Sequence, residues 1–221
     1  MAKKALTWLT YLSVLAATYL VFMWVPNEKV MGPVQKIFYF HVAAAWVGFF
    51  AFLIVFLCGV AYLVTRAEKW DLYGASSAEI GVLFTTIVLI TGPIWARPTW
   101  NAWWTWDPRL TTTLVLWFIY LAYLMVRTSF PEPEKRMRFS AIFGIIGFID
   151  VPIVWFSIRW WRTIHPVVVD GSGFAMSSKM LTTLLVSLVA FTLLYLYLLT
   201  TRVAVARIDN QIQRIKEAVL R

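Results

Sequence analysis

The hydrophobic and polar positions divide the chain into six long apolar segments with short polar segments between them. The apolar segments cover approximately residues 5–25, 37–65, 77–96, 109–127, 138–158 and 179–201. A bilayer core about 30 Å thick requires about 20 apolar residues per helix, which is the length of these segments. They lack the alternation typical of strands, which disfavours a β-barrel. The pattern predicts an all-α, polytopic integral membrane protein with six transmembrane helices.

The composition agrees with a membrane protein and excludes several soluble classes. Hydrophobic residues make up 61% of the chain and charged residues 14%, against about 45–50% and about 25% in soluble domains. A soluble enzyme, a disordered chain and a nucleic-acid-binding module are therefore excluded, although the net charge is +9. The only cysteine, Cys58, lies in an apolar segment, which excludes intramolecular disulfides and cysteine metal clusters. No internal repeat is evident, so residues 1–221 are expected to form a single domain.

The basic residues predict how the helices are oriented in the membrane. Thirteen Lys and Arg residues fall on the side that carries both chain ends, and seven fall on the other side. Because the side richer in Lys and Arg faces the cytoplasm, both termini are expected to be cytoplasmic. Residues 26–36, 97–108 and 159–178 then form outward loops. Residues 202–221 predict a short amphipathic helix at the cytoplasmic face.

Tryptophan is concentrated at the outward ends of the predicted helices. Five of the 13 tryptophans fall within twelve residues, where the chain average of 13 in 221 would place 0.7. Ten of the 13 lie on the outward side, whereas an aromatic belt should populate both interfaces. This one-sided distribution favours an aromatic binding platform over simple anchoring. The clustered residues are Trp95, Trp100, Trp103, Trp104 and Trp106, and Trp160 and Trp161 lie in another outward loop.

Three acidic positions have structural interpretations. Asp107 followed by Pro108 is typical of a helix cap and a first helical residue, so the fourth helix is expected to begin at Pro108. Ser76 with Glu79 fits a capping box at the start of the third helix. Asp150 lies within the fifth apolar segment, where an ionisable group is a functional candidate. It is equally a candidate for pairing with an arginine or a free backbone amide.

The two histidines of the chain both map to the outward side. His41 lies in the first turns of the second apolar segment, and His165 lies in the last outward loop. Imidazole is a common axial ligand of haem iron, and a porphyrin also needs apolar walls and cations near its carboxylates. A zinc site is disfavoured, because it needs three or four ligands and only two histidines and scattered carboxylates are available. The outward cations are Arg97, Arg109, Arg159 and Arg162.

The sequence Trp95-Ala-Arg-Pro-Thr-Trp-Asn-Ala-Trp-Trp-Thr-Trp-Asp-Pro-Arg109 resembles the tryptophan-rich "WWD" signature of the haem-handling proteins of cytochrome c maturation. Residues 38–42 and 152–165 resemble the two histidine segments that flank this signature. Six predicted helices and about 220 residues resemble the CcmC branch, haem exporter protein C, more than the longer CcmF and CcsA branches. The resemblance covers roughly residues 30–200. The chain departs from the family at Ala43, Ala96, Asn101 and Pro166, where the family often has Pro, Gly, Gly and Gln.

The resemblance implies that the protein holds haem b non-covalently as a transported ligand, without being an enzyme. His41 and His165 would be the axial ligands. The haem would pass to the periplasmic chaperone CcmE, with CcmA, CcmB and CcmD as subunits of the same complex. The protein would lie among the lipids of a bacterial inner membrane, with its tryptophan-rich loop in the periplasm. The residues implied in haem binding are His41, His165, Trp95, Trp100, Trp103, Trp104, Trp106, Asp107, Arg109, Trp160, Trp161 and Arg162.

Three other functions stay open at the level of the sequence. A membrane b-type cytochrome that carries electrons would place its histidine pair inside the helix bundle, whereas His165 lies in a loop. A small-molecule or ion transporter would show broken helices or paired charges near the membrane centre, for which Asp150-Val-Pro152 is the only candidate. A membrane assembly subunit that does not bind haem would use its tryptophans for protein contacts alone.

Overall fold

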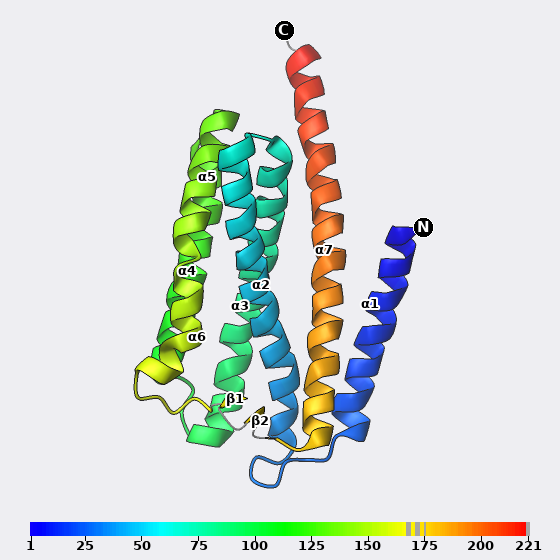
Figure 1. The fold of residues 1–221 in the computed structure, drawn as a ribbon, viewed down its shortest axis with the longest axis vertical. Coiled ribbons are helices and arrows are strands. Elements are labelled where there is room, and N and C mark those ends of the chain that lie inside the picture. Colours follow the sequence, from blue (N-terminus) through cyan, green and yellow to red (C-terminus); the bar gives the residue numbers. More distant parts are fainter. Residues whose placement is uncertain (167–168, 171–172, 175, 220–221) are drawn as a thin grey trace.

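Two long antiparallel helices form the centre of the molecule (Figure 1). The structure, a computed structural model, describes residues 1–166, 169–170, 173–174 and 176–219. The central helices are α2 (Lys36–Thr65) and α3 (Glu68–Trp100). Arg66 ends α2 in the left-handed conformation, with φ 56°, and its backbone N–H donates to the Tyr62 carbonyl. The chain can therefore reverse within two residues and begin α3 at Glu68.

Small residues allow the central helices to pack closely. A Cβ atom at Gly81 of α3 would clash with the Phe52 ring of α2, and one at Gly48 would lie 3.0 Å from Thr85 Oγ1. Ser77 of α3 donates to the Ala51 carbonyl at 2.7 Å and lies 2.8 Å from the Tyr195 hydroxyl. Small residues and buried hydroxyls of this kind are typical of interfaces between membrane helices.

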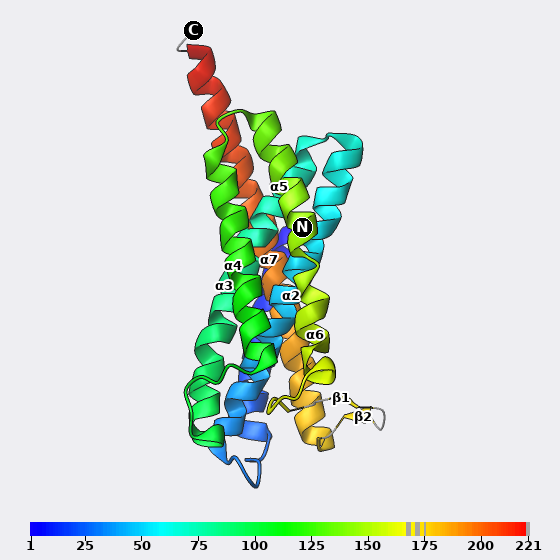
Figure 2. The same cartoon turned by 90° about the vertical axis from the view of Figure 1, so that its left-hand side faces the viewer.

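The remaining helices flank the central pair on two sides. In Figure 2, α4 and the α5–α6 pair lie on the side facing the viewer, and α7 with α1 lies on the other side in Figure 1. The β1 and β2 strands form a small antiparallel pair before α7. The bounds are α1 Ala2–Tyr19, the π-helical η1 Leu20–Trp24, the 3-10 helix η2 Pro33–Gln35, α4 Pro108–Ser129, α5 Pro133–Gly147, α6 Asp150–Trp160, β1 Val169–Asp170, β2 Gly173–Phe174 and α7 Ser178–Val219.

The prediction of six membrane helices is confirmed. The described part of the chain contains six helical stretches that are long and apolar enough to cross a membrane. Both chain ends point toward one end of the bundle, and the tryptophan-rich loop and β1–β2 lie at the opposite end (Figures 1 and 2). This multi-span architecture places the two histidine segments and the tryptophan-rich loop together.

The expected capping box at Ser76 and Glu79 is wrong. Helix α3 begins eight residues earlier, at Glu68, so Ser76 lies inside the helix and is buried. Glu79 instead forms an ion pair with Arg202 of α7, with N–O distances of 2.5 and 2.8 Å. The local motif is misleading because its carboxylate has a partner 123 residues away in the sequence.

The expected continuous helix over residues 138–158 is broken between Gly147 and Asp150. Pro152 has no backbone N–H and cannot donate to the Phe148 carbonyl four residues earlier, which accepts from Val151 at 3.0 Å instead. Asp150 lies in the first turn of α6, where a carboxylate is favoured by the helix dipole. Asp150 does not line the cavity described below, and the expected pairing with an arginine or a free backbone amide is not found for its Oδ2, which is buried without a hydrogen-bond partner among the described residues.

The C-terminal helix is longer than predicted. Residues 202–219 are helical, as expected, but they continue α7 directly instead of forming a separate helix. In Figure 1 this part of α7 extends beyond the other helices. The end of the apolar segment predicts a helix boundary near residue 201, but the helix continues because no Gly or Pro follows Thr200.

Candidate functional site

A cavity of about 360 Å³ lies at the end of the bundle that carries the tryptophan-rich loop. This volume lies within the usual range of small-molecule sites, about 300–1,000 Å³. Its walls come from α2, α3, α4, α6 and α7 and from the segments that follow α3 and α6. Both histidines of the chain line it. Most of the wall is apolar, including Val42, Phe49, Val88, Leu89, Leu110, Ile158, Leu184 and Leu188.

His41 is held from α2 against the facing helix α3. Its Nδ1 lies 2.8 Å from Thr91 Oγ1, and that hydroxyl donates its proton to the Ile87 carbonyl at 2.7 Å. Because Thr91 has one hydroxyl proton, Nδ1 must carry the proton of its bond to Thr91. The imidazole is then in the Nδ1–H form, with a free electron pair on Nε2. Gly92 leaves room beside the ring, since a Cβ there would lie 3.5 Å from His41 Cε1.

His165 is held by the segment that follows α6. Its Nδ1 lies 3.3 Å from the Pro166 carbonyl, which can only accept, so Nδ1 again carries the proton and Nε2 is free. Trp100 contacts the ring edge to face, with centroids 6.3 Å apart. Burial, with a contribution from the nearby Arg109, lowers the pKa of His165 to about 4. The ring is therefore neutral at pH 7 and able to coordinate a metal.

Asp107 connects the tryptophan-rich loop to the His165 segment. Its Oδ1 accepts from the backbone N–H of Arg109 at 2.9 Å, which confirms the predicted cap of α4. Its Oδ2 accepts from the Thr163 hydroxyl at 2.6 Å and from the Ile164 N–H at 3.0 Å. The Thr163 hydroxyl in turn accepts from the His165 N–H at 3.0 Å. Asp107 itself does not line the cavity, so it acts by positioning His165.

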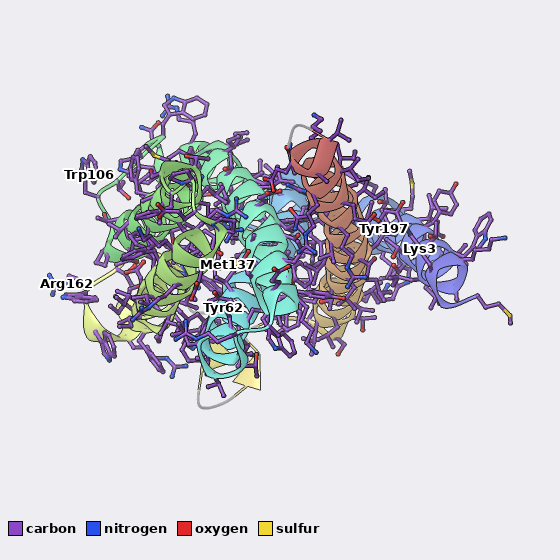
Figure 3. The ribbon with its side chains drawn as sticks, turned by 90° about the horizontal axis from the view of Figure 1, so that it is seen from above. Lys3, Tyr62, Trp106, Met137, Arg162 and Tyr197 are labelled. Carbon is purple, nitrogen blue, oxygen red and sulfur yellow. The ribbon has the colours of Figure 1, made fainter. Side chains whose placement is uncertain are left out.

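Two cations reach the cavity from neighbouring helix ends. Arg109 of α4 lines it and lies over the Trp155 ring, with the guanidinium carbon 5.8 Å from the centroid. Arg159 of α6 lines it as well. Arg97 is directed elsewhere, because it bonds to the Asn101 carbonyl and side chain at the end of α3. Arg162 is exposed at the edge of the molecule (Figure 3).

The predicted tryptophans separate into two groups. Trp95, Trp100 and Trp104 line the cavity, and the indole N–H groups of Trp95 and Trp104 are buried without an acceptor among the described residues. Trp103 and Trp106 are 60% and 76% exposed, and Figure 3 shows Trp106 at the edge of the molecule. Trp160 and Trp161 are exposed as well. These four residues lie outside the cavity lining.

The departures from the family pattern fit this backbone. Asn101 ends α3 in the left-handed conformation, with φ 54°, which Gly adopts most easily and Asn tolerates. Ala43 and Ala96 are buried helical residues, and Pro166 supplies the carbonyl that holds His165.

Several site residues were not predicted from the sequence. Thr91 carries no motif and is separated from His41 by 50 residues. Trp155 and Thr163 lie within the segment 152–165 that resembles the family, but nothing local indicates that one contacts Arg109 and the other Asp107. Among the described residues, no group of three His, Cys, Asp or Glu side chains forms a metal cluster.

Comparison with known proteins identifies the family. The sequence model described as "CcmC: Heme exporter protein C" matches residues 1–218. The chain belongs to this family. Its relatives include heme exporter protein C of Bradyrhizobium diazoefficiens, which is 34% identical over 175 residues, or 78% of this chain and 66% of the relative. The multi-span fold and the tryptophan-rich segment are thus those of a haem exporter C family member.

Relatives in this family occur in bacteria and plants. A putative cytochrome c biosynthesis ccmC-like mitochondrial protein of Marchantia polymorpha is 36% identical over 166 residues, which cover 75% of this chain and 70% of the relative. Heme exporter protein C of Escherichia coli K12 is 35% identical over 164 residues, which cover 72% of this chain and 66% of the relative. The matches thus span about two thirds of the length of these curated relatives.

Proposed function

We propose that this chain binds one haem b non-covalently in the cavity and delivers it to a periplasmic haem chaperone for cytochrome c biogenesis. The observation that carries the proposal is that two imidazoles, each with a free Nε2, line one apolar cavity. Neutral imidazoles are common axial ligands of haem iron. Haem is the cargo here, and the protein's task is to bind it, shield it and release it.

The other polar groups of the cavity suit the edge of a haem. Haem carries two propionate carboxylates, which accept hydrogen bonds and pair with cations. Arg109 and Arg159 supply the cations, and the indole N–H groups of Trp95 and Trp104, which have no acceptor within the described part of the chain, supply donors. The apolar walls and Trp100 would cover the porphyrin faces. Buried donors without acceptors are costly, so a ligand carrying acceptor oxygens would stabilise this arrangement.

The orientation and partners follow from the charge distribution and the family. The excess of Lys and Arg near both chain ends supports cytoplasmic termini in a bacterial inner membrane, with the cavity facing the periplasm. The recipient would be the haem chaperone CcmE, with CcmA, CcmB and CcmD in the same complex. Four exposed tryptophans would then lie where the periplasmic surface of the inner membrane meets water, in contact with lipid headgroups or the recipient. They are Trp103, Trp106, Trp160 and Trp161.

The double variant His41→Ala with His165→Ala tests the proposed function. We expect the purified variant to lose nearly all bound haem, because neither axial position would be filled. Haem content per protein and the Soret absorbance measure the effect. The matched control is Trp8→Ala with Tyr11→Ala, which removes two exposed aromatic residues of α1. Haem content and a spectrum equal to those of the wild type in the double histidine variant would contradict the proposal.

Gly92 offers an independent test of where the cargo lies. We expect Gly92→Leu to lose most of the bound haem, because the side chain would occupy the cavity beside His41. Gly92→Ala is the control, since its Cβ would lie at an ordinary contact distance of 3.5 Å from the ring. The measurement is the haem content per protein of the purified Gly92→Leu and Gly92→Ala variants. Full haem retention in a folded Gly92→Leu variant would show that haem does not bind in the part of the cavity beside His41.

A further inference from the structure

The two imidazoles that line the cavity are held in very different ways. His41 lies within α2, and its Nδ1–H donates to Thr91 of α3 at 2.8 Å. The Thr91 oxygen is itself fixed by its 2.7 Å bond to the Ile87 carbonyl. Both partners are therefore on long helices of the central pair, so the hydrogen bond that orients the ring joins two fixed elements.

His165 lacks such a support. It lies after the end of α6 at Trp160, outside any helix. Its ring bond is longer, 3.3 Å, and its acceptor is the carbonyl of the next residue, which moves with it. The connection to Asp107 runs through Thr163 and Ile164 and holds the backbone, not the ring. The His165 ring can therefore turn away from the cavity without disturbing a helix.

We propose that Thr91 is a positioning residue that keeps His41 on the haem iron, and that His165 is the ligand that leaves when haem is handed on. This inference rests on the proposed function. In the step, the bond between iron and His165 Nε2 breaks and the electron pair stays on Nε2. A donor atom of the recipient then fills the vacant axial position, and the oxidation state of the iron does not change.

The unequal support of the two histidines allows the protein to bind haem tightly and still release it to a recipient. A hydrogen bond to Nδ1 orients a ligating imidazole and increases its basicity, and loss of such a partner typically weakens metal binding about 10- to 100-fold. His41 has this support from a hydroxyl on a neighbouring helix, whereas His165 has it only from the carbonyl of the next residue, at 3.3 Å. While His165 is detached, His41 and the apolar walls would still hold the cargo. Haem would therefore stay bound to the protein after His165 detaches and until the donor atom of the recipient coordinates the iron.

The single histidine variants test the order of release. We expect His165→Ala to keep at least half of the wild-type haem in a five-coordinate, high-spin form, which free imidazole converts to the low-spin form. We expect His41→Ala to keep less than a tenth. Haem content and the optical spectrum in detergent measure both. Equal losses, or greater retention in His41→Ala, would overturn the proposal.

The Thr91 series tests the positioning role and remains informative if His41→Ala does not fold. In the His165→Ala background, we expect Thr91→Val to speed haem loss to apomyoglobin about 10- to 100-fold and to lower the basicity of His41, shifting the Soret band. Thr91→Ser should restore both values. Thr183→Val is the matched control, because Thr183 makes the same bond to the carbonyl of Lys179 but lies outside the cavity lining. A Thr91→Val variant that behaves like Thr183→Val would overturn the positioning role.

The failure of this proposal is distinct from failure of the proposed function. If the double histidine variant keeps wild-type haem and spectrum, these residues are not ligands and both proposals fall. If that variant loses haem but the single variants lose it equally, haem binding stands and the unequal roles fall.

Discussion

Replacing Asp107 with alanine is expected to lower the haem affinity of the purified protein while leaving the helix bundle folded. The substitution removes one cap bond to Arg109 and both bonds to Thr163 and Ile164. Loss of a cap costs about 1 kcal/mol, which a bundle of this size should tolerate. Loss of the connection to residues 163–165 frees His165, and we expect haem affinity to fall about 10- to 100-fold.

Thermal unfolding and haem titration of the same Asp107→Ala sample separate these two effects. Thr163→Val is the graded comparison, because it removes the bonds of the hydroxyl to Asp107 and to the His165 N–H but keeps the cap of α4 and the bond from Ile164 to Asp107. Its haem affinity should lie between those of the wild type and Asp107→Ala. If Asp107→Ala binds haem as tightly as the wild type, the carboxylate is only a helix cap and the positioning argument fails.

The second large effect concerns the two groups of tryptophans. We expect Trp100→Ala with Trp104→Ala to lower haem affinity at least about 100-fold, because burying an aromatic side chain against the ligand contributes about 1.5–3 kcal/mol, or about 3–6 kcal/mol for the pair. We expect Trp103→Ala with Trp106→Ala to bind haem as the wild type does, since both rings are exposed and lie outside the cavity. Equilibrium haem titrations in detergent compare the pairs.

The paired design makes this prediction specific, because both variants remove two indoles from the same tryptophan-rich segment, residues 95–106. Equal losses in the two pairs would mean that the loop acts as a single surface and that the cavity does not define the site. Loss confined to Trp103 and Trp106 would move the site to the exposed face of the loop.

Much of the architecture could be predicted from the sequence because the bilayer imposes a simple length rule on apolar segments. The Asp107 cap was also predictable, since a cap and the following proline are local features. The Ser76–Glu79 motif has the same local pattern but forms no cap, because α3 extends through it and Glu79 pairs with Arg202. Helix boundaries that depend on such distant partners are not encoded locally.

The sequence predicts which residue types form the site better than it predicts how those residues are arranged in space. The two histidines and the tryptophan cluster stand out because they are rare or concentrated. Which tryptophans face inward depends on the path of the chain between Asn101 and Pro108, which has no regular period. Thr91 could not be identified, because threonines that bond to their own helix are common in this chain and only the packing of α2 on α3 brings one to His41.

The most direct test of the central claim is to count the histidine nitrogens bound to the haem iron. The chain contains two histidines, so hyperfine spectroscopy of the ferric protein, labelled with ¹⁵N-histidine and purified through a histidine-free tag, reports on His41 and His165 alone. Two directly coordinated imidazole nitrogens are predicted for the wild type, and one for His165→Ala. A wild-type spectrum without any coupling from labelled histidine would contradict the account.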